Sequence, residues 1–258
     1  MTSKLSLILL LTVMFVHFPT ATSASSPAIE FRFEEPGNEV NAEILKAIKA
    51  EGFIQVIKNE LSRDVSLSEP IIVDFMQLKD PDEGPYYDPE EKKIVIPYHF
   101  WTYVYDELNQ DAQGEMATDE LNILTGDIII HMLYHEIAHA LIDVKELAIT
   151  GREEDAADEL AVLMILDHFE KGTYIALTAA DFFELEGSYQ DEITDEDLFG
   201  EHALDDQRFF NILCLVYGYG DAEAKEIMTE LEVDEERLGI CEEDFDKRRT
   251  AWDKLLGT

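Results

Sequence analysis

The sequence has little positive charge, little cysteine and, after its first residues, no long apolar run. Among 258 residues there are 19 Lys and Arg but 57 Asp and Glu, for a formal net charge of −38 at pH 7. A surface this acidic repels nucleic acid and anionic lipid, so neither is expected as a partner. There are 2 cysteines, neither of them in a C-x-x-C pair, which leaves a thiolate zinc site or a dithiol redox motif without support.

Residues 1–24 have the layout of a secretory signal peptide. Lys4 precedes an apolar run from Leu5 to Val16, and a stretch of small residues ends at Ala24. The run is too short for a permanent membrane helix, and no later run approaches the roughly 18 residues that a span needs. We therefore predict a secreted or periplasmic protein that starts near Ser25 and has no membrane association after signal removal.

Export also bears on the two cysteines, Cys214 and Cys241, because an exported protein meets an oxidising environment. A single disulfide joining two helical segments of the C-terminal part is the prediction. Two buried thiols are the alternative.

Residues 25–258 are expected to form a single domain of the α+β class, with strands early and helices late. Residues 25–145 would form a lobe with a small sheet, and residues 146–258 a helical lobe. A strand follows Pro70, and a hairpin turns at Asp88–Glu91 into a second strand. Because Pro97 has no amide hydrogen for a sheet, this strand either ends there or lies at a sheet edge. Apolar spacing predicts helices over Asn38–Asn59 with a break at Gly52, Phe100–Leu108, Asp127–Leu141, Arg152–Phe169, Ala203–Tyr217, Ala222–Leu231 and Glu242–Leu256.

The segment HEIAH lies in a helix that is apolar on nearly every side, which is typical of a helix in the protein interior. Its ionisable residues His135, Glu136 and His139 need partners there, since buried charge is costly. His135 and His139 lie about 40° apart around the helix, so both rings reach one ion, whereas Glu136 lies beside it. In an H-E-x-x-H motif the two imidazoles bind zinc and the glutamate is the general base.

A third ligand is expected on the following helix. Glu154 and Asp158 share one helix face with Ala157, Ala161 and Ile165, so this face is predicted to point inward and to carry both acids with it. Glu154 would bind the metal, and Asp158 would hydrogen-bond the outer nitrogen of a ligand histidine. The alternative, that acids here only favour the positive helix N-terminus, suits neighbouring Glu153 and Asp155 but leaves Asp158 unexplained.

The pairing of HEIAH with EDAAD resembles the H-E-x-x-H and E-x-x-A-D pattern of the gluzincin metallopeptidases. More narrowly, HEIAHALIDVKELAITGREEDAADELA, the upstream YYDPEEKKIVIPY and the downstream EHALDDQRFFNILCLVYG are similar to a family of exported bacterial proteins described as "putative metallopeptidase". The resemblance implies a zincin-like fold, zinc held by His135, His139 and Glu154, Glu136 as general base, and Asp158 as a histidine orienter. It implies no particular substrate.

Further candidates follow from the needs of a zinc hydrolase. His202 and Arg208 are predicted as donors that stabilise the oxyanion, although Arg208 has many acids to pair with instead. His131, one turn before the motif, is expected to be a core or outer-shell histidine and not a fourth ligand.

The resulting interpretation is a zinc-dependent metallopeptidase that hydrolyses a peptide or protein substrate, with the edge of the early hairpin binding the peptide as an added strand. The rival interpretation is a catalytically inactive binding protein that keeps the metal helices as a closed structural site, with His131 or Asp158 bound directly. The oligomeric state is left open.

Overall fold

A computed structural model describes residues 28–50, 52–190 and 192–257. The predicted signal peptide and its cleavage point therefore lie outside the described residues. Within those residues, no helix is both long and apolar enough to cross a membrane.

The N-terminal part forms a four-stranded sheet in the order β1-β2-β4-β3. Strands β1 (Ile29–Phe33), β2 (Ile71–Met76) and β4 (Lys93–Pro97) run parallel, and β3 (Tyr86–Asp88) pairs antiparallel with β4 as an edge strand. Ile94, Val95 and Ile96 of β4 are all buried, so this strand is covered on both faces. The predicted hairpin and the strand end at Pro97 are confirmed, and α3 (Tyr98–Asp111) starts directly afterwards.

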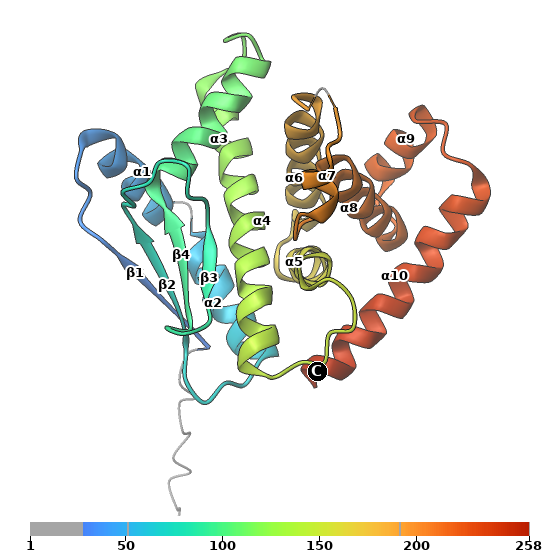
Figure 1. Ribbon diagram of the computed structural model, residues 1–258, viewed down its shortest axis with the longest axis horizontal. Helices are drawn as coiled ribbons and strands as arrows, with labels where there is room; N and C mark the ends of the chain where they lie inside the picture. The colour runs from blue at the N-terminus through green and yellow to red at the C-terminus, as the bar shows by residue number, and fades with distance from the viewer. Residues whose placement is uncertain (1–27, 51, 191, 258) are drawn as a thin grey trace, which may run out of the picture.

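Helix α4 (Thr118–Val144) stands between the sheet and the later helices, as Figure 1 shows. It packs against β3 and β4 on one side and against α5 (Glu153–His168) and α6 (Gly172–Ser188) on the other. Its burial all round confirms the prediction from its apolar sequence. The site residues of α4 are therefore held in the centre of the molecule.

A buried hydrogen-bond chain links α4, α5 and α2 (Phe53–Asp64). His168 Nε2 lies 2.8 Å from the Asp64 carboxylate, which can only accept, so the ring proton is on Nε2. His168 Nδ1 then accepts from the Tyr134 hydroxyl at 2.7 Å. The buried side chains of Tyr134 and His168 thus have hydrogen-bond partners, as buried polar groups need.

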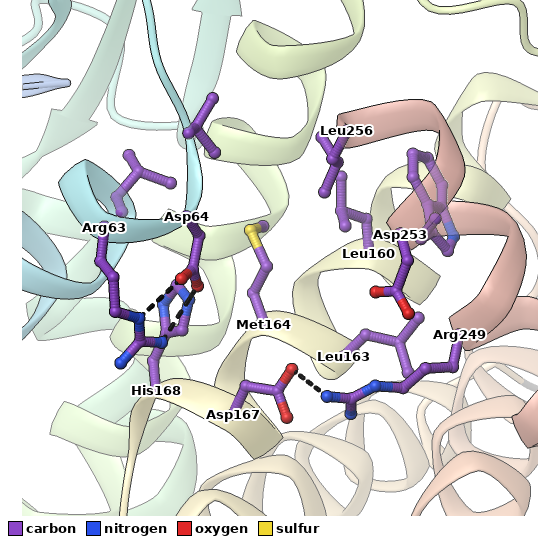
Figure 2. Close-up of a pocket in the computed structure, with 13 residues that line it drawn as sticks. Arg63, Asp64, Leu160, Leu163, Met164, Asp167, His168, Arg249, Asp253 and Leu256 are labelled. Carbon is purple, nitrogen blue, oxygen red and sulfur yellow. Dashed lines mark hydrogen bonds and ion pairs between the residues drawn. The ribbon is translucent and has the colours of Figure 1, made fainter. Parts of the chain in front are cut away.

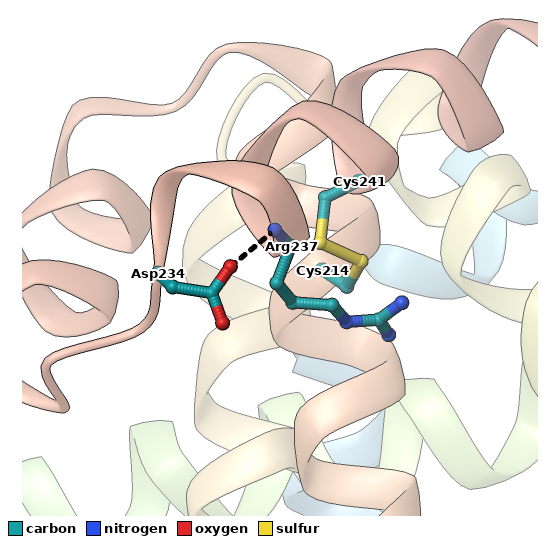
Figure 3. The surroundings of a disulfide bond; sticks show 4 residues. All are labelled: Cys214, Asp234, Arg237 and Cys241. Atoms are coloured by element: carbon teal, nitrogen blue, oxygen red, sulfur yellow. Dashed lines mark hydrogen bonds between the residues drawn. A yellow bond between two sulfur atoms is a disulfide. The ribbon is translucent and has the colours of Figure 1, made fainter.

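The remaining helices are α1 (Glu39–Ala50), α7 (Asp195–Phe199), α8 (Asp205–Tyr219), α9 (Ala222–Glu230) and α10 (Glu235–Leu256). The C-terminal helix α10 crosses back over α5, where Trp252 Nε1 donates to the Glu159 carboxylate at 2.8 Å. Asp234 caps the start of α10 by accepting from the Arg237 backbone N–H, and nearby the disulfide ties α10 to α8 (Figure 3). The predicted bond between Cys214 and Cys241 is confirmed.

The α+β prediction is confirmed, but several elements differ from the sequence-based expectation. Strand β1 and helices α6 and α7 were not predicted, and α4 starts at Thr118 instead of Asp127. The sequence of α6 is apolar on most sides and has Gly172 at its start, so it shows no clear helical stripe. A Cβ at Gly172 would lie 2.4 Å from the Ile165 carbonyl oxygen, so only glycine lets α6 begin this close to α5.

Candidate metal centre

Three predicted ligands converge between α4 and α5. Nε2 of His135 and Nε2 of His139 lie 3.2 Å apart, and each lies 3.1 Å from Glu154 Oε2. The helical spacing brings the two rings together, and the buried Ala157 and Ala161 allow α5 to approach α4 closely enough for Glu154 to reach them.

The hydrogen bonds at Nδ1 of the two histidines suit both rings to bind a cation through Nε2. His135 Nδ1 lies 2.7 Å from Asp158 Oδ1, and His139 Nδ1 lies 2.9 Å from Glu153 Oε1. Carboxylates only accept, so each neutral ring carries its proton on Nδ1 and presents a lone pair at Nε2. Two imidazole lone pairs then face a carboxylate oxygen, an arrangement that a shared cation stabilises.

The donor atoms also fit the size of a zinc ion. Zinc binds histidine nitrogen and carboxylate oxygen at about 2.0–2.2 Å in tetrahedral geometry, which places neighbouring ligand atoms roughly 3.4 Å apart. The observed separations of 3.1 and 3.2 Å are close to that edge length. Two imidazoles and one carboxylate are a donor set that suits zinc.

Asp158 links this cluster to Arg208 on α8. Besides the His135 ring, its carboxylate accepts from Nε and from Nη2 of Arg208, both at 2.8 Å. Burial would raise the pKa of the Asp158 carboxyl, but the charge of Arg208 and the bond from His135 hold that pKa well below its ordinary value. The guanidinium also packs over the Phe183 ring at 3.8 Å, so Arg208 is held in place from two sides.

Glu136 lies beside the cluster, close enough for its carboxyl to interact electrostatically with His135, His139 and Glu154. It is buried, and this burial raises the pKa of its carboxyl above the ordinary value, against the lowering effect of His135 and His139. A carboxylate with a raised pKa accepts a proton more readily, which is the property that a general base requires.

His202, in the segment before α8, also reaches the cluster. Its Nδ1 lies 3.2 Å from Glu154 Oε2, and its side chain is 53% exposed. Its backbone carbonyl accepts from Arg152 Nη1 at 3.3 Å. Ligand atoms of His135, Glu154 and His202 all lie within 4.8 Å of one another, so His202 stands at the open side of the site.

A family model described as "Putative metallopeptidase" matches residues 33–256. The chain belongs to this metallopeptidase family. The match includes every predicted site residue, and the family supports a peptidase role in the hydrolase class. Searches of curated proteins and of solved structures found no significant match.

In this member of the family the cluster opens into a cleft of about 970 Å³. The edge strand β3 lies along it, and both Tyr86 and Tyr87 line it. Tyr87 is fixed there because its hydroxyl donates to Asp143 at 2.7 Å. The lining of the cleft is acidic. Besides Glu136 and Glu154 it includes four acidic residues but one cationic residue, Arg152; the four are Asp143, Glu146, Glu153 and Glu201.

Sequence reasoning assigned Glu153 only to the helix dipole, but its carboxylate also orients His139. The sequence feature that could have predicted this role is the position of Glu153 next to Glu154, in the same turn of the same helix. His131 is fully buried, packs edge-on to Phe183 at 5.7 Å and has no hydrogen-bond partner at either ring nitrogen.

A second cavity, of about 430 Å³, lies away from the metal cluster among α2, α5 and α10 (Figure 2). Four of its charged groups form two pairs, Arg63 with Asp64 and Arg249 with Asp167. The His168 side chain at its wall is committed to Tyr134 and Asp64. These groups therefore serve the packing of the three helices.

Proposed function

We propose that this protein is an exported zinc-dependent peptidase that hydrolyses peptide bonds at the His135–His139–Glu154 cluster. The observation that carries the proposal is the convergence of two imidazole Nε2 atoms and one carboxylate oxygen at separations close to those of a tetrahedral zinc site, with a buried glutamate beside them. A zinc ion bound there would polarise the scissile carbonyl and lower the pKa of an attacking water toward 7.

Other residues of the chain have the proton-transfer and positioning roles in the proposed reaction. Glu136 accepts the proton of the attacking water and passes it to the leaving amine. Asp158 and Glu153 keep the two histidines in the required tautomer and orientation. Arg208 acts as a positioning residue, because its guanidinium holds the Asp158 carboxylate by two hydrogen bonds.

His202 is the residue proposed to stabilise the oxyanion. Its ring lies at the exposed side of the cluster, 5.8 Å from the His135 ring. A hydrogen-bond donor on this ring would face the carbonyl oxygen of a substrate that binds in the cleft. Arg208, which the sequence also suggested for this role, has its guanidinium directed to Asp158.

The substrate is proposed to bind as an additional strand along β3. The outer edge of β3 is unpaired within the described sheet, and Tyr86 and Tyr87 place this edge against the cleft. An extended peptide on such an edge gains backbone hydrogen bonds that do not depend on its sequence.

The rival function is a binding protein with a closed metal site, and one observation favours it: His202 lies near enough to serve as a fourth ligand. The residues first suggested for closure are engaged elsewhere. Asp158 faces His135 Nδ1 and Arg208, and His131 lies in the core against Phe183.

The test compares wild type, Glu154→Ala, Glu136→Gln and a control, Glu120→Gln, which changes an exposed glutamate of the same helix α4. Bound metal is measured by elemental mass spectrometry, hydrolysis with a peptide library, and the open coordination position by binding of a peptide hydroxamate. We expect one zinc per chain except in Glu154→Ala, and hydrolysis in wild type and Glu120→Gln only. Full hydrolysis by Glu136→Gln would contradict the general base, and zinc without hydroxamate binding would favour the closed site.

A further inference from the structure

A smaller cavity of about 230 Å³ adjoins the metal centre among α3, α4, α6 and α8. It shares Pro85, His135, Glu136 and His202 with the lining of the main cleft. A substrate chain that lies across the cluster therefore passes its entrance. Any side chain that enters the cavity belongs to a residue next to the reacting bond.

The walls of this cavity are aromatic or flexible and apolar, formed by Phe100, Tyr103, Met132, Phe182 and Phe183. The Tyr103 ring stacks on Phe100 at 6.0 Å and meets Phe182 edge-on at 6.5 Å. Such walls favour a long methylene chain, and aromatic faces attract a cationic group at its end.

The cavity is not purely apolar, because its lining includes three carboxylates: Glu136 at the metal centre, and Glu186 and Asp205. Glu186 Oε2 accepts from the Tyr103 hydroxyl at 2.6 Å, whereas Oε1 is buried without a hydrogen-bond partner. An unpaired buried carboxylate oxygen is unfavourable, and a cationic donor relieves the cost. Burial raises the pKa of the Glu186 carboxyl, the hydrogen bond from Tyr103 opposes this shift, and the charges of Glu107 and Asp205 add to it.

The cation already present in the lining is committed to another partner. Arg208 donates two hydrogen bonds to Asp158 and packs on Phe183, so its charge is already balanced by a carboxylate. The cleft outside is acidic as well, with Asp143, Glu146, Glu153 and Glu201 against Arg152. Both features favour a positively charged substrate over an acidic one.

We propose that this cavity is the specificity pocket of the enzyme and that it takes a lysine or arginine side chain, whose cationic end is bound by Glu186. The proposal rests on the peptidase function proposed above and adds the class of residue that the enzyme selects beside the cleaved bond. A free amino terminus is the other source of a primary ammonium group, but it lacks the methylene chain that the aromatic walls would cover.

Binding is tested in full-length protein that carries Glu136→Gln, so that peptides are held without being cut. The ligands are N-acetylated peptides that differ at one position, with lysine, arginine, norleucine or phenylalanine, and a matched norleucine peptide with a free amino terminus. Each is measured again after adding Glu186→Gln, which keeps an acceptor for Tyr103 but removes the charge. The control adds Glu184→Gln, an exposed glutamate two residues earlier on α6.

We expect lysine and arginine peptides to bind about tenfold or more tightly than norleucine, with the preference lost in Glu186→Gln and kept in Glu184→Gln. Equal or tighter binding of norleucine or phenylalanine, a preference that survives Glu186→Gln, or no binding of any peptide would overturn the assignment. Tighter binding of only the free amino terminus would overturn it in favour of terminal-amine recognition. A lysine preference in the variant without cleavage by wild type would instead contradict the peptidase function and leave the pocket assignment supported.

Discussion

Replacement of Asp158 by asparagine keeps the size of the side chain and changes its hydrogen bonding and charge. The carboxylate accepts from His135 Nδ1 and from two nitrogens of Arg208, at 2.7, 2.8 and 2.8 Å. An asparagine has one acceptor oxygen, and its amide group would direct N–H donors at Arg208 or at the histidine ring. The variant therefore leaves a buried guanidinium without its counter-charge.

The expected loss of stability follows from the burial of the ion pair between Asp158 and Arg208. The side chains of Arg208 and Asp158 are 10% and 14% exposed, so solvent screens their interaction weakly. Removing one partner of a buried ion pair costs about 3–5 kcal/mol of unfolding free energy. Because the same carboxylate orients His135, zinc affinity should fall by about 10- to 100-fold.

Two measurements check these expectations: urea unfolding of the metal-free protein at pH 7, and zinc affinity by competition with a chromophoric chelator. The control is Asp155→Asn, which alters an exposed acid on the same helix and should change stability by less than about 0.5 kcal/mol. If Asp158→Asn matched wild type in both measurements, Asp158 would neither balance Arg208 nor position His135.

Two further predictions concern stability away from the ligands. Burial lowers the pKa of His131 to about 3, so the unfolded chain binds a proton at this histidine more readily than the folded chain does. The free energy of unfolding should therefore fall by about 1.4 kcal/mol per pH unit as the pH falls from about 6.5 toward 3. The variant His131→Leu should lose stability less steeply over this range in urea titrations, and parallel curves would contradict the burial argument. Replacing both Cys214 and Cys241 by serine removes a disulfide whose cysteines are 27 residues apart in the sequence. From the entropy of closing a loop of this length, the free energy of unfolding should fall by about 3.5 kcal/mol. Calorimetry should show a lower Tm, whereas an unchanged Tm would mean that packing alone holds α10 on α8.

Local periodicity in the sequence was enough to predict the central part of the candidate site. The spacing of His135 and His139 fixes the direction of both rings within one helix, and the buried face of α5 carries Glu154 and Asp158 together with Ala157, Ala161 and Ile165. The burial of α4 and the strand end at Pro97 follow from composition and backbone chemistry in the same way.

Only the tertiary structure brought together residues that are distant along the chain. The approach of Arg208 to Asp158, of His202 to Glu154 and of Tyr103 to Glu186 depends on how α3, α5, α6 and α8 pack around α4. Helical periodicity says which side of a helix a residue occupies but not which helix faces it. Helix α6 is apolar on most sides and therefore shows no helical periodicity in its sequence. Its packing against α4, α5 and α8 places Phe183 and Glu186 at the cavity beside the metal centre.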